Sequence, residues 1–425
     1  MEEDHQLKQQ ASEGTKPSYI RTLRNRSLFF LWISQVISQS GDYIFEVALL
    51  WLVVVTTKSA SAVGIAVAVM LTPTVIVGPL AGVVIDRVDR RNIMIGANVF
   101  QGAIVFSLSV LFLINGLTFP LLLVLLFMLS AGSQFTRSAS QAMIPSLVGP
   151  DDLGAANGLF SLSSNFNQLA SMGLGGIVVA IFGVATPILY DGATFFVAAA
   201  LLLMVPRLAV AVKSLNPSDK DAQKGFLSDF AEGFGFIRQN RLLLEVIGLA
   251  VVLNFFGAMA SALSAPYAKF VLGGNAAAFG FLGASVALGG IGGAFIAGKM
   301  DMRRFVGSML FAGIIAIGAG MLVWGLTQNL YVALASGLVL GAGGAIANLP
   351  FGVLLQAKVP SRLLGRVTTA LGASVTAAQP IAALVAGALV TKLTVGQVYL
   401  LSGIVILVVS FVGYLVLKDI REARF

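Results

Sequence analysis

The stretch "GPLAGVVIDRVDRRNIM", residues 78–94, places a dense group of charges between two long apolar runs. The chain around it is 57% hydrophobic and only 11% charged. A charge at the centre of a bilayer costs roughly 2.5 to 3.5 kcal/mol, so the segment "DRVDRR" is expected in water, in a short turn between two membrane helices. The runs on either side of such turns therefore decide the fold.

Apolar runs of about 20 residues, the length that crosses ~30 Å of hydrocarbon as a helix, recur along the whole chain. The mean hydropathy of +0.92 is far above that of a soluble domain. The sequence predicts an all-α integral membrane protein with twelve transmembrane helices. The predicted spans are residues 27–56, 61–85, 92–114, 120–141, 155–183, 186–205, 241–270, 276–298, 305–327, 330–354, 367–392 and 397–417.

The distribution of positive charge predicts the orientation. When the loops are assigned alternately to two sides, 24 of the 27 Lys and Arg residues fall on the side of both termini. Only Lys58, Lys269 and Lys392 fall on the other side. By the positive-inside rule, both termini are expected in the cytoplasm, and the protein is expected in the inner membrane of the cell.

A long polar interruption between Arg207 and Arg241 divides the chain into six spans plus six. Weak internal similarity supports two parallel repeats, because Pro150 and Gln168 have counterparts about 210 positions later, at Pro360 and Gln379. The predicted parts are a cytosolic tail (residues 1–26), an N-terminal six-helix lobe (27–205), a cytoplasmic linker (206–240), a C-terminal six-helix lobe (241–417) and a second cytosolic tail (418–425).

Within the linker, Phe226, Phe230 and Phe234 recur every four residues beside Asp229 and Glu232. One face of a helix with this spacing is aromatic and another is acidic, which is typical of an interfacial helix on the inner leaflet. A docking site for a soluble partner is the alternative.

The segment "GPLAGVVIDRVDRR" resembles the signature that transporters of the major facilitator superfamily carry between their second and third helices. Three further segments resemble the branch of macrolide and siderophore exporters: "LWISQVISQSGDYIFEVALLWLV" (31–53), "IPSLVGPDDLGAANGL" (144–159) and "VPSRLLGRV" (359–367). The resemblance implies two six-helix lobes that work by alternating access. It also implies a conformational latch that holds the outward-open state, made of Gly78, Gly82, Asp86, Arg87, Arg90 and Arg91.

The spacing of the latch residues agrees with this role. Gly78 and Gly82 are four apart, so one side of the helix is bare and another helix can approach it closely. Asp86 then lies where it can accept hydrogen bonds from a facing helix N-terminus or an Arg. The alternative is that the arginines only determine topology. Unlike the better-known drug/proton antiporters, the fourth span has no Arg in its outer half, and Arg137 lies toward its cytoplasmic end.

Three carboxylates lie inside predicted spans: Asp42, Glu46 and Asp191. Asp42 and Glu46 are four residues apart and share one face of the first span. Since lone carboxylates in hydrocarbon are costly, this pair is predicted to bind and release the proton that couples transport. The alternatives are that either residue makes a fixed structural bond to a polar neighbour, or that one of them lies near the outer surface. For Asp191, a position close to the outer interface with a capping or structural role is favoured over coupling.

Polar and aromatic groups in the spans predict a cavity for a bulky, partly apolar solute, although bonds between helices are an equal alternative for any one of the polar residues. No Lys or Arg lies near the centre of a span, which disfavours an anionic substrate. The predicted lining is Gln35, Tyr43, Asn165, Phe166, Gln168, Asn254, Phe255, Phe256 and Gln379, with Asn348 as a further polar group in a span.

Several function classes are excluded or disfavoured. The chain has no Cys and its single His5 lies in the polar N-terminal segment, so no metal site or cofactor is expected. It has no Walker loop or nucleophile elbow, and no enzyme is predicted. We predict a secondary transporter, a monomer among membrane lipids with no nucleic-acid partner, that exports amphiphilic molecules against protons. Proton-coupled uptake, facilitated transport and a transport-inactive membrane sensor are the alternatives.

Overall fold

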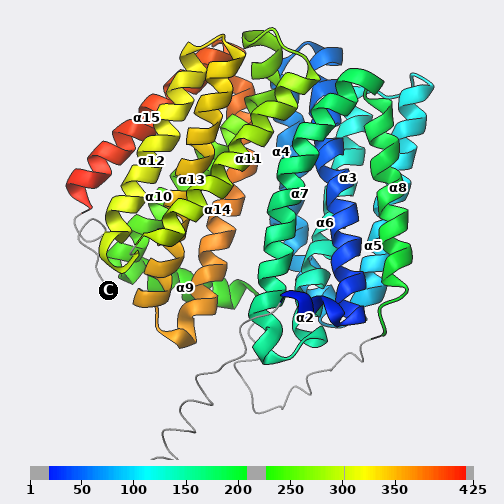
Figure 1. Ribbon diagram of the computed structural model, residues 1–425. Helices are drawn as coiled ribbons and strands as arrows, with labels where there is room; N and C mark the ends of the chain where they lie inside the picture. Colours follow the sequence, from blue (N-terminus) through cyan, green and yellow to red (C-terminus); the bar gives the residue numbers. More distant parts are fainter. Residues whose placement is uncertain (1–18, 208–225, 301, 418–425) are drawn as a thin grey trace, which may run out of the picture.

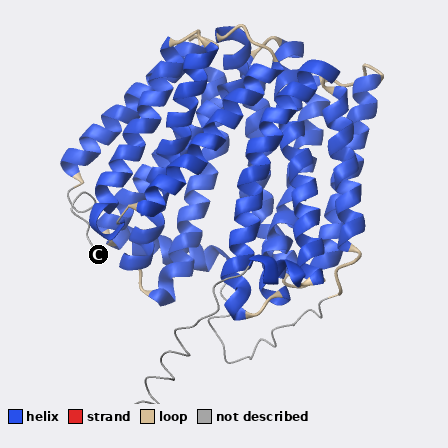
Figure 2. Cartoon of the chain, in the orientation of Figure 1, coloured by secondary structure: helices blue, strands red, loops and turns tan. Residues whose placement is uncertain are grey.

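The structure is a computed structural model that describes residues 19–207, 226–300 and 302–417. These parts of the chain are helices joined by short turns, and they contain no strand (Figure 2). Twelve of the helices are long and apolar enough to cross a membrane, so the predicted number of spans is confirmed. The two predicted tails and most of the linker lie outside the described residues.

Each half of the chain contributes six long helices. Those of the first lobe are α3 (Arg26–Thr57), α4 (Ala60–Ile85), α5 (Arg90–Leu113), α6 (Phe119–Leu147), α7 (Leu153–Phe182) and α8 (Ala185–Leu202). Those of the second lobe are α10 (Arg241–Pro266), α11 (Ala276–Lys299), α12 (Met302–Leu326), α13 (Leu330–Lys358), α14 (Ser361–Leu389) and α15 (Val395–Val416). Short helices flank them: α2 (Tyr19–Arg24), η1 (Pro150–Asp152), α9 (Phe226–Gln239) and η2 (Tyr267–Val271).

Side-chain caps fix where several helices begin. The Asn25 side chain accepts hydrogen bonds from the backbone N–H groups of Ser27 and Leu28, at 3.1 and 3.2 Å, and so starts α3. The Asp89 carboxylate accepts from the N–H of Asn92 at 3.1 Å and starts α5. Such caps satisfy backbone donors that a helix end leaves free, which allows tight turns between adjacent helices.

The two lobes stand side by side and meet along the pairs α4 with α14 and α7 with α11 (Figure 1). We call the end of the bundle that carries α2 the terminal end, and the end that carries the α3–α4 turn the opposite end. Because twelve helices cross the bundle, the last residues of α15 also point to the terminal end. The arrangement is the predicted two-lobed fold.

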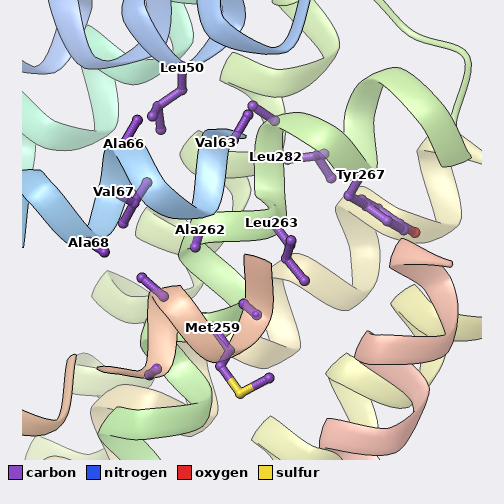
Figure 3. Close-up of a cluster of buried hydrophobic side chains, with 14 of the residues drawn as sticks. Leu50, Val63, Ala66, Val67, Ala68, Met259, Ala262, Leu263, Tyr267 and Leu282 are labelled. Atoms are coloured by element: carbon purple, nitrogen blue, oxygen red, sulfur yellow. The ribbon is translucent and has the colours of Figure 1, made fainter. Parts of the chain in front are cut away.

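A buried apolar cluster connects the lobes toward the opposite end (Figure 3). It contains Leu50 of α3 and Val67 of α4 from the first lobe, and Ala262, Leu263 and Leu282 from α10 and α11 of the second. All five side chains are at most 8% exposed. Burial of apolar surface on this scale stabilises the contact between the lobes in this conformation.

Glycines permit the closest approach between the lobes. A Cβ atom added to Gly64 would lie 2.8 Å from the Cα of Gly387, and one added to Gly176 would lie 2.9 Å from the Cα of Gly280. Both crossings are in the opposite-end halves of their helices. The Ser61 hydroxyl adds a hydrogen bond of 2.6 Å to the carbonyl of Gly387. The lobes are therefore in direct backbone contact at the opposite end.

Glycines near the terminal ends of three of these helices have no such contact. No described atom of another element lies within 4 Å of a Cβ built on Gly82 of α4, Gly154 of α7 or Gly365 of α14. The glycine contacts between the lobes are thus found toward the opposite end, and the ribbons of the two lobes stand apart at the terminal end (Figure 1). If the termini are cytoplasmic, as the charge distribution predicts, this conformation faces inward.

The predicted helix in the linker is present as α9. It packs against the second lobe. Ile237 is 1% exposed in a cluster with residues of the second lobe, and α9 packs on α14. Glu232 forms an ion pair with Arg366 of α14. Phe234 is 43% exposed. The helix is held to the terminal end of the second lobe.

Candidate transport site

A cavity of about 790 Å³ lies between the lobes and extends into the second one. Its wall comes from α3, α4 and α7 of the first lobe and from α10 to α14 of the second. Most of the wall is apolar, with polar side chains at a few positions. These polar residues are Glu46, Asn165, Gln168, Asn254, Ser261, Ser264, Asn348 and Gln379.

Four of the residues predicted to line the cavity do so: Asn165, Gln168, Asn254 and Gln379. Gln168 and Gln379 occupy corresponding positions in the two halves of the chain, on α7 and α14. The repeat therefore brings two equivalent amides to opposite walls of one cavity. The Asn254 side chain donates a hydrogen bond to the carbonyl of Ala250 at 2.9 Å, which leaves its carbonyl oxygen available to a ligand.

The other five predicted lining residues lie elsewhere, and this is a correction. Gln35 is only 9% exposed inside the first lobe, and Tyr43 is not part of the wall. Phe166 is 68% exposed, while the rings of Phe255 and Phe256 pack edge to face at 5.6 Å. Successive residues on a helix point about 100° apart, so the neighbours of a lining residue face away from the cavity.

Large apolar side chains also line the cavity, and the sequence did not predict them. Met172, Phe279, Trp324 and Phe351 all line the cavity. The indole N–H of Trp324 donates to the carbonyl of Ala333 at 2.8 Å, which fixes the ring. Apolar residues occur all along membrane helices, so no local pattern in the sequence separated these from lipid-facing ones.

Glu46 is the one ionisable residue among the described residues of the wall. Asp42 lies one turn away on α3, partly buried and close enough for the charges of the two carboxyls to interact, but outside the wall. The predicted pair is thus split between two environments. Glu46 can meet a ligand directly, whereas Asp42 lies deeper in the first lobe.

Tyr43 follows Asp42 on α3 and interacts with groups of two other helices. The Tyr43 hydroxyl is within hydrogen-bonding reach of Ser164, and the charge of Arg137 acts on it. Arg137 is exposed on α6. Arg137 is not part of the described cavity wall.

The structure corrects the expected position of Asp191. Its side chain is fully buried, 0% exposed, and it packs against Gly41 in the middle of α3. It is therefore neither at an interface with water nor at a helix end. The close approach is possible because Gly41 has no side chain: a Cβ there would lie 2.5 Å from a carboxyl oxygen of Asp191.

The charged residues of the turn between α4 and α5 fall into two groups, those bonded within the first lobe and those that are exposed. Arg90 donates to the carbonyl of Ala142 at 2.8 Å, and Arg91 donates to the carbonyls of Leu202 and Leu203 at 2.9 and 2.7 Å. These arginines tie the turn to α6 and to the end of α8 within the first lobe. The side chains of Asp86 and Arg87 are exposed, and neither has a hydrogen bond or ion pair to the described residues.

Replacement of Arg91 by Ala should destabilise the protein, because the carbonyls of Leu202 and Leu203 at the end of α8 each lose the hydrogen bond that Arg91 donates. We expect a loss of about 1 to 2 kcal/mol, at the low end for hydrogen bonds to a charged group because the site is partly exposed. Thermal unfolding in detergent measures this change. Arg87→Ala is the matched control, since it removes an equal charge without a bond. Equal behaviour of the two variants would leave Arg91 as a topology determinant only.

Comparisons with known proteins agree with this architecture. Residues 18–423 match the family described as "Transmembrane secretion effector". The chain is 23% identical over 398 residues to macrolide efflux protein A of Streptococcus pyogenes, covering 93% of this chain and 96% of that protein. It is 25% identical over 372 residues to the multidrug efflux pump Tap of Mycolicibacterium fortuitum, covering 85% and 88%. The crystal structure of the nucleoside transporter NupG superposes with a TM-score of 0.75 at 12% identity, covering 92% and 99%, a likeness of fold alone.

Proposed function

Since this chain belongs to the transmembrane secretion effector family of major facilitator transporters, we propose that it exports amphiphilic small molecules in exchange for protons. It does so by alternating access between the conformation described here and one that opens at the opposite end. The protein acts as a monomer in the cell membrane, with both termini in the cytoplasm, and it carries out no catalysis.

The chemistry of the cavity wall is the observation that carries the proposed substrate class. Apolar side chains such as Met172 and Phe351 offer surface to a hydrophobic body, and amides such as Gln168 and Gln379 offer hydrogen bonds. Glu46 contributes a negative charge, and no Lys or Arg belongs to the described wall. A neutral or cationic amphiphile fits this lining better than an anion. The macrolide and multidrug efflux relatives support the same class.

Proton coupling is proposed for Glu46 and Asp42. Glu46 faces the cavity, and Asp42 is its neighbour one turn away. A negative Glu46 holds a cationic substrate, and a protonated Glu46 releases it, so one proton and one substrate compete for the site. Competition of this kind is the simplest way to couple outward substrate movement to inward proton movement.

Reconstitution into liposomes tests the proposal. In vesicles that expose the terminal end to the bath, an acidic lumen should drive erythromycin or ethidium into the lumen. A gradient of about one pH unit supports up to tenfold accumulation at one proton per substrate, because about 1.4 kcal/mol is a factor of ten. A protonophore should abolish it. Equal distribution of every probe, with and without the gradient, would contradict proton-coupled export.

The latch between the lobes is proposed for the other conformation. Among the described residues, no atom of another element lies within 4 Å of a Cβ built on Gly82, and the Asp86 side chain has no bond, so this surface can meet a helix of the second lobe when the terminal end closes. In that state, Asp86 accepts hydrogen bonds that are missing in the inward-facing one.

Asp86→Asn should therefore shift the population further toward the conformation that is open at the terminal end. The expected shift is about 1 to 3 kcal/mol, the usual size of conformational coupling. Because the chain has no Cys, spin labels can be placed at Gly149 and Arg362, and the distance distribution between them reports the opening. Asp151→Asn, which neutralises another exposed carboxylate of the same end, is the control. An unchanged distribution in folded Asp86→Asn protein would remove the latch from the account.

A further inference from the structure

The carboxyl group of Asp191 is buried without a hydrogen-bond partner. The residue is 0% exposed, and neither carboxyl oxygen has a partner among the described residues. The nearby Thr194 hydroxyl donates its hydrogen to the backbone carbonyl of Asp191 at 2.8 Å. Buried polar groups are normally satisfied, and a buried carboxylate without a partner is more stable in its neutral, protonated form. The Asp191 carboxyl is therefore expected to hold a proton.

Asp42 follows Gly41, the residue against which Asp191 packs. Its charge acts on Asp191 from α3, where the adjacent Gly41 lets the two helices approach. On the other side, α5 presents Val105 and Phe106 beside Gly192. The ionisable residues of α5, Arg90 and Arg91, are at its terminal-end start and are bonded to carbonyls there. Helix α7, which also contacts α8, has no ionisable residue in its sequence.

We propose that Asp191 is the buried member of a proton-binding pair with Asp42 across the α3–α8 contact, and that this pair takes over the coupled proton when Glu46 releases it. The inference rests on the proposed proton coupling and adds to it a residue that the cavity does not reach. Two carboxyls that interact in a low-dielectric interior do not both ionise. The pair thus keeps one proton, with a charge of −1, and becomes neutral on binding a second.

The pair gives the two carboxyls of α3 different tasks. Glu46 lies in the cavity wall and meets the substrate, whereas Asp42 is acted on by the charge of Glu46 and itself acts on Asp191. A proton received at Asp42 is retained by the pair away from the substrate. Changes in its protonation alter the charge at the α3–α8 contact inside the first lobe.

Infrared spectroscopy of the purified, reconstituted protein tests the pair without a known substrate. Aspartate labelled with ¹³C at the carboxyl separates the aspartate signals from those of Glu46. In the unmutated chain, a labelled band of protonated carboxyl should be present at neutral pH and should grow on mild acidification. In Asp191→Asn, the neutral-pH band should be lost, because it belongs to Asp191, whereas the growth on mild acidification, which belongs to Asp42, should remain.

Three further proteins complete the test. Glu245→Gln neutralises a carboxyl paired with Arg241 at 2.8 Å at the start of α10, and its spectrum should match the unmutated one. Asp191→Ser is a second neutral variant and should repeat the result of Asp191→Asn. If neither Asp191 variant folds, Asp42→Asn provides the test. Its labelled band at neutral pH should persist, because this band belongs to Asp191.

The outcomes separate this inference from the proposed function. A labelled band that is unchanged in intensity and pH in both Asp191 variants, or its absence from the unmutated protein or from Asp42→Asn, overturns the pair. A pair that titrates as described in a protein that shows no gradient-driven accumulation would instead overturn proton-coupled export and leave the pair intact.

Discussion

Asp42→Asn is expected to abolish uphill transport while substrate binding remains. The amide has nearly the same size as the carboxyl and mimics its protonated form, but it cannot release a proton. Downhill exchange of substrate survives, whereas the pH gradient loses its link to the conformational cycle. At one pH unit, the accumulation ratio should fall from about tenfold to one. Accumulation of erythromycin in proteoliposomes, measured beside equilibrium binding of the same compound, checks both halves of this expectation.

The neighbouring carboxyl provides the comparison. Glu46→Gln should give a similar or milder defect, and it should also weaken the binding of a cationic probe, because Glu46 faces the cavity. If the two carboxyls act as a unit, the double variant should be little worse than the more severe single one. Full uphill transport with unaltered pH dependence in all three variants would place coupling elsewhere in the protein.

Gly176→Leu is expected to block closure at the opposite end. A Cβ at this position would lie 2.6 Å from the carbonyl oxygen of Ala276 and 2.9 Å from the Cα of Gly280. These are backbone atoms of α11, so no flexible side chain can move aside. Overpacking of this kind costs about 1 to 3 kcal/mol, which reduces the population of the closed contact by roughly 5-fold to 150-fold. Transport should fall accordingly, since each cycle passes through this contact.

Spin labels at Thr118 and Gln328, in turns at the opposite end of the two lobes, measure the expected separation. Gly96→Leu is the matched control, because a Cβ on this exposed glycine of α5 meets nothing within 4 Å. Distances in Gly176→Leu that equal those of the control would show that the lobes close without the glycine crossing.

The number and order of the helices could be predicted because the bilayer leaves few alternatives. Each span needs about 20 apolar residues, and charges such as those between Asp86 and Arg91 must lie outside it. The family could also be predicted, because the same turn carries a family-specific spacing of glycines and charges. The existence of α9 followed from the recurrence of Phe every four residues, although its ion pair between Glu232 and Arg366 joins residues 134 positions apart and had no local signal.

The site was only partly predictable. Polar residues in membrane helices are rare enough to be noticed, which is how Glu46, Gln168 and Gln379 were found. Whether such a residue faces the cavity depends on the rotation of its helix, and adjacent positions such as Asn165 and Phe166 point in different directions. The burial of Asp191 depends on a contact between α3 and α8 that only the packed bundle defines.

Substrate-driven proton movement tests the central claim most directly. Proteoliposomes with a pH-sensitive dye in the lumen start at equal pH on both sides, and erythromycin is added to the bath at the terminal end of the protein. The account predicts that erythromycin entry drives protons out, so that the lumen becomes alkaline. The signal should be absent from Asp42→Asn vesicles. Erythromycin entry through the unmutated protein without any change in luminal pH would contradict proton-coupled export.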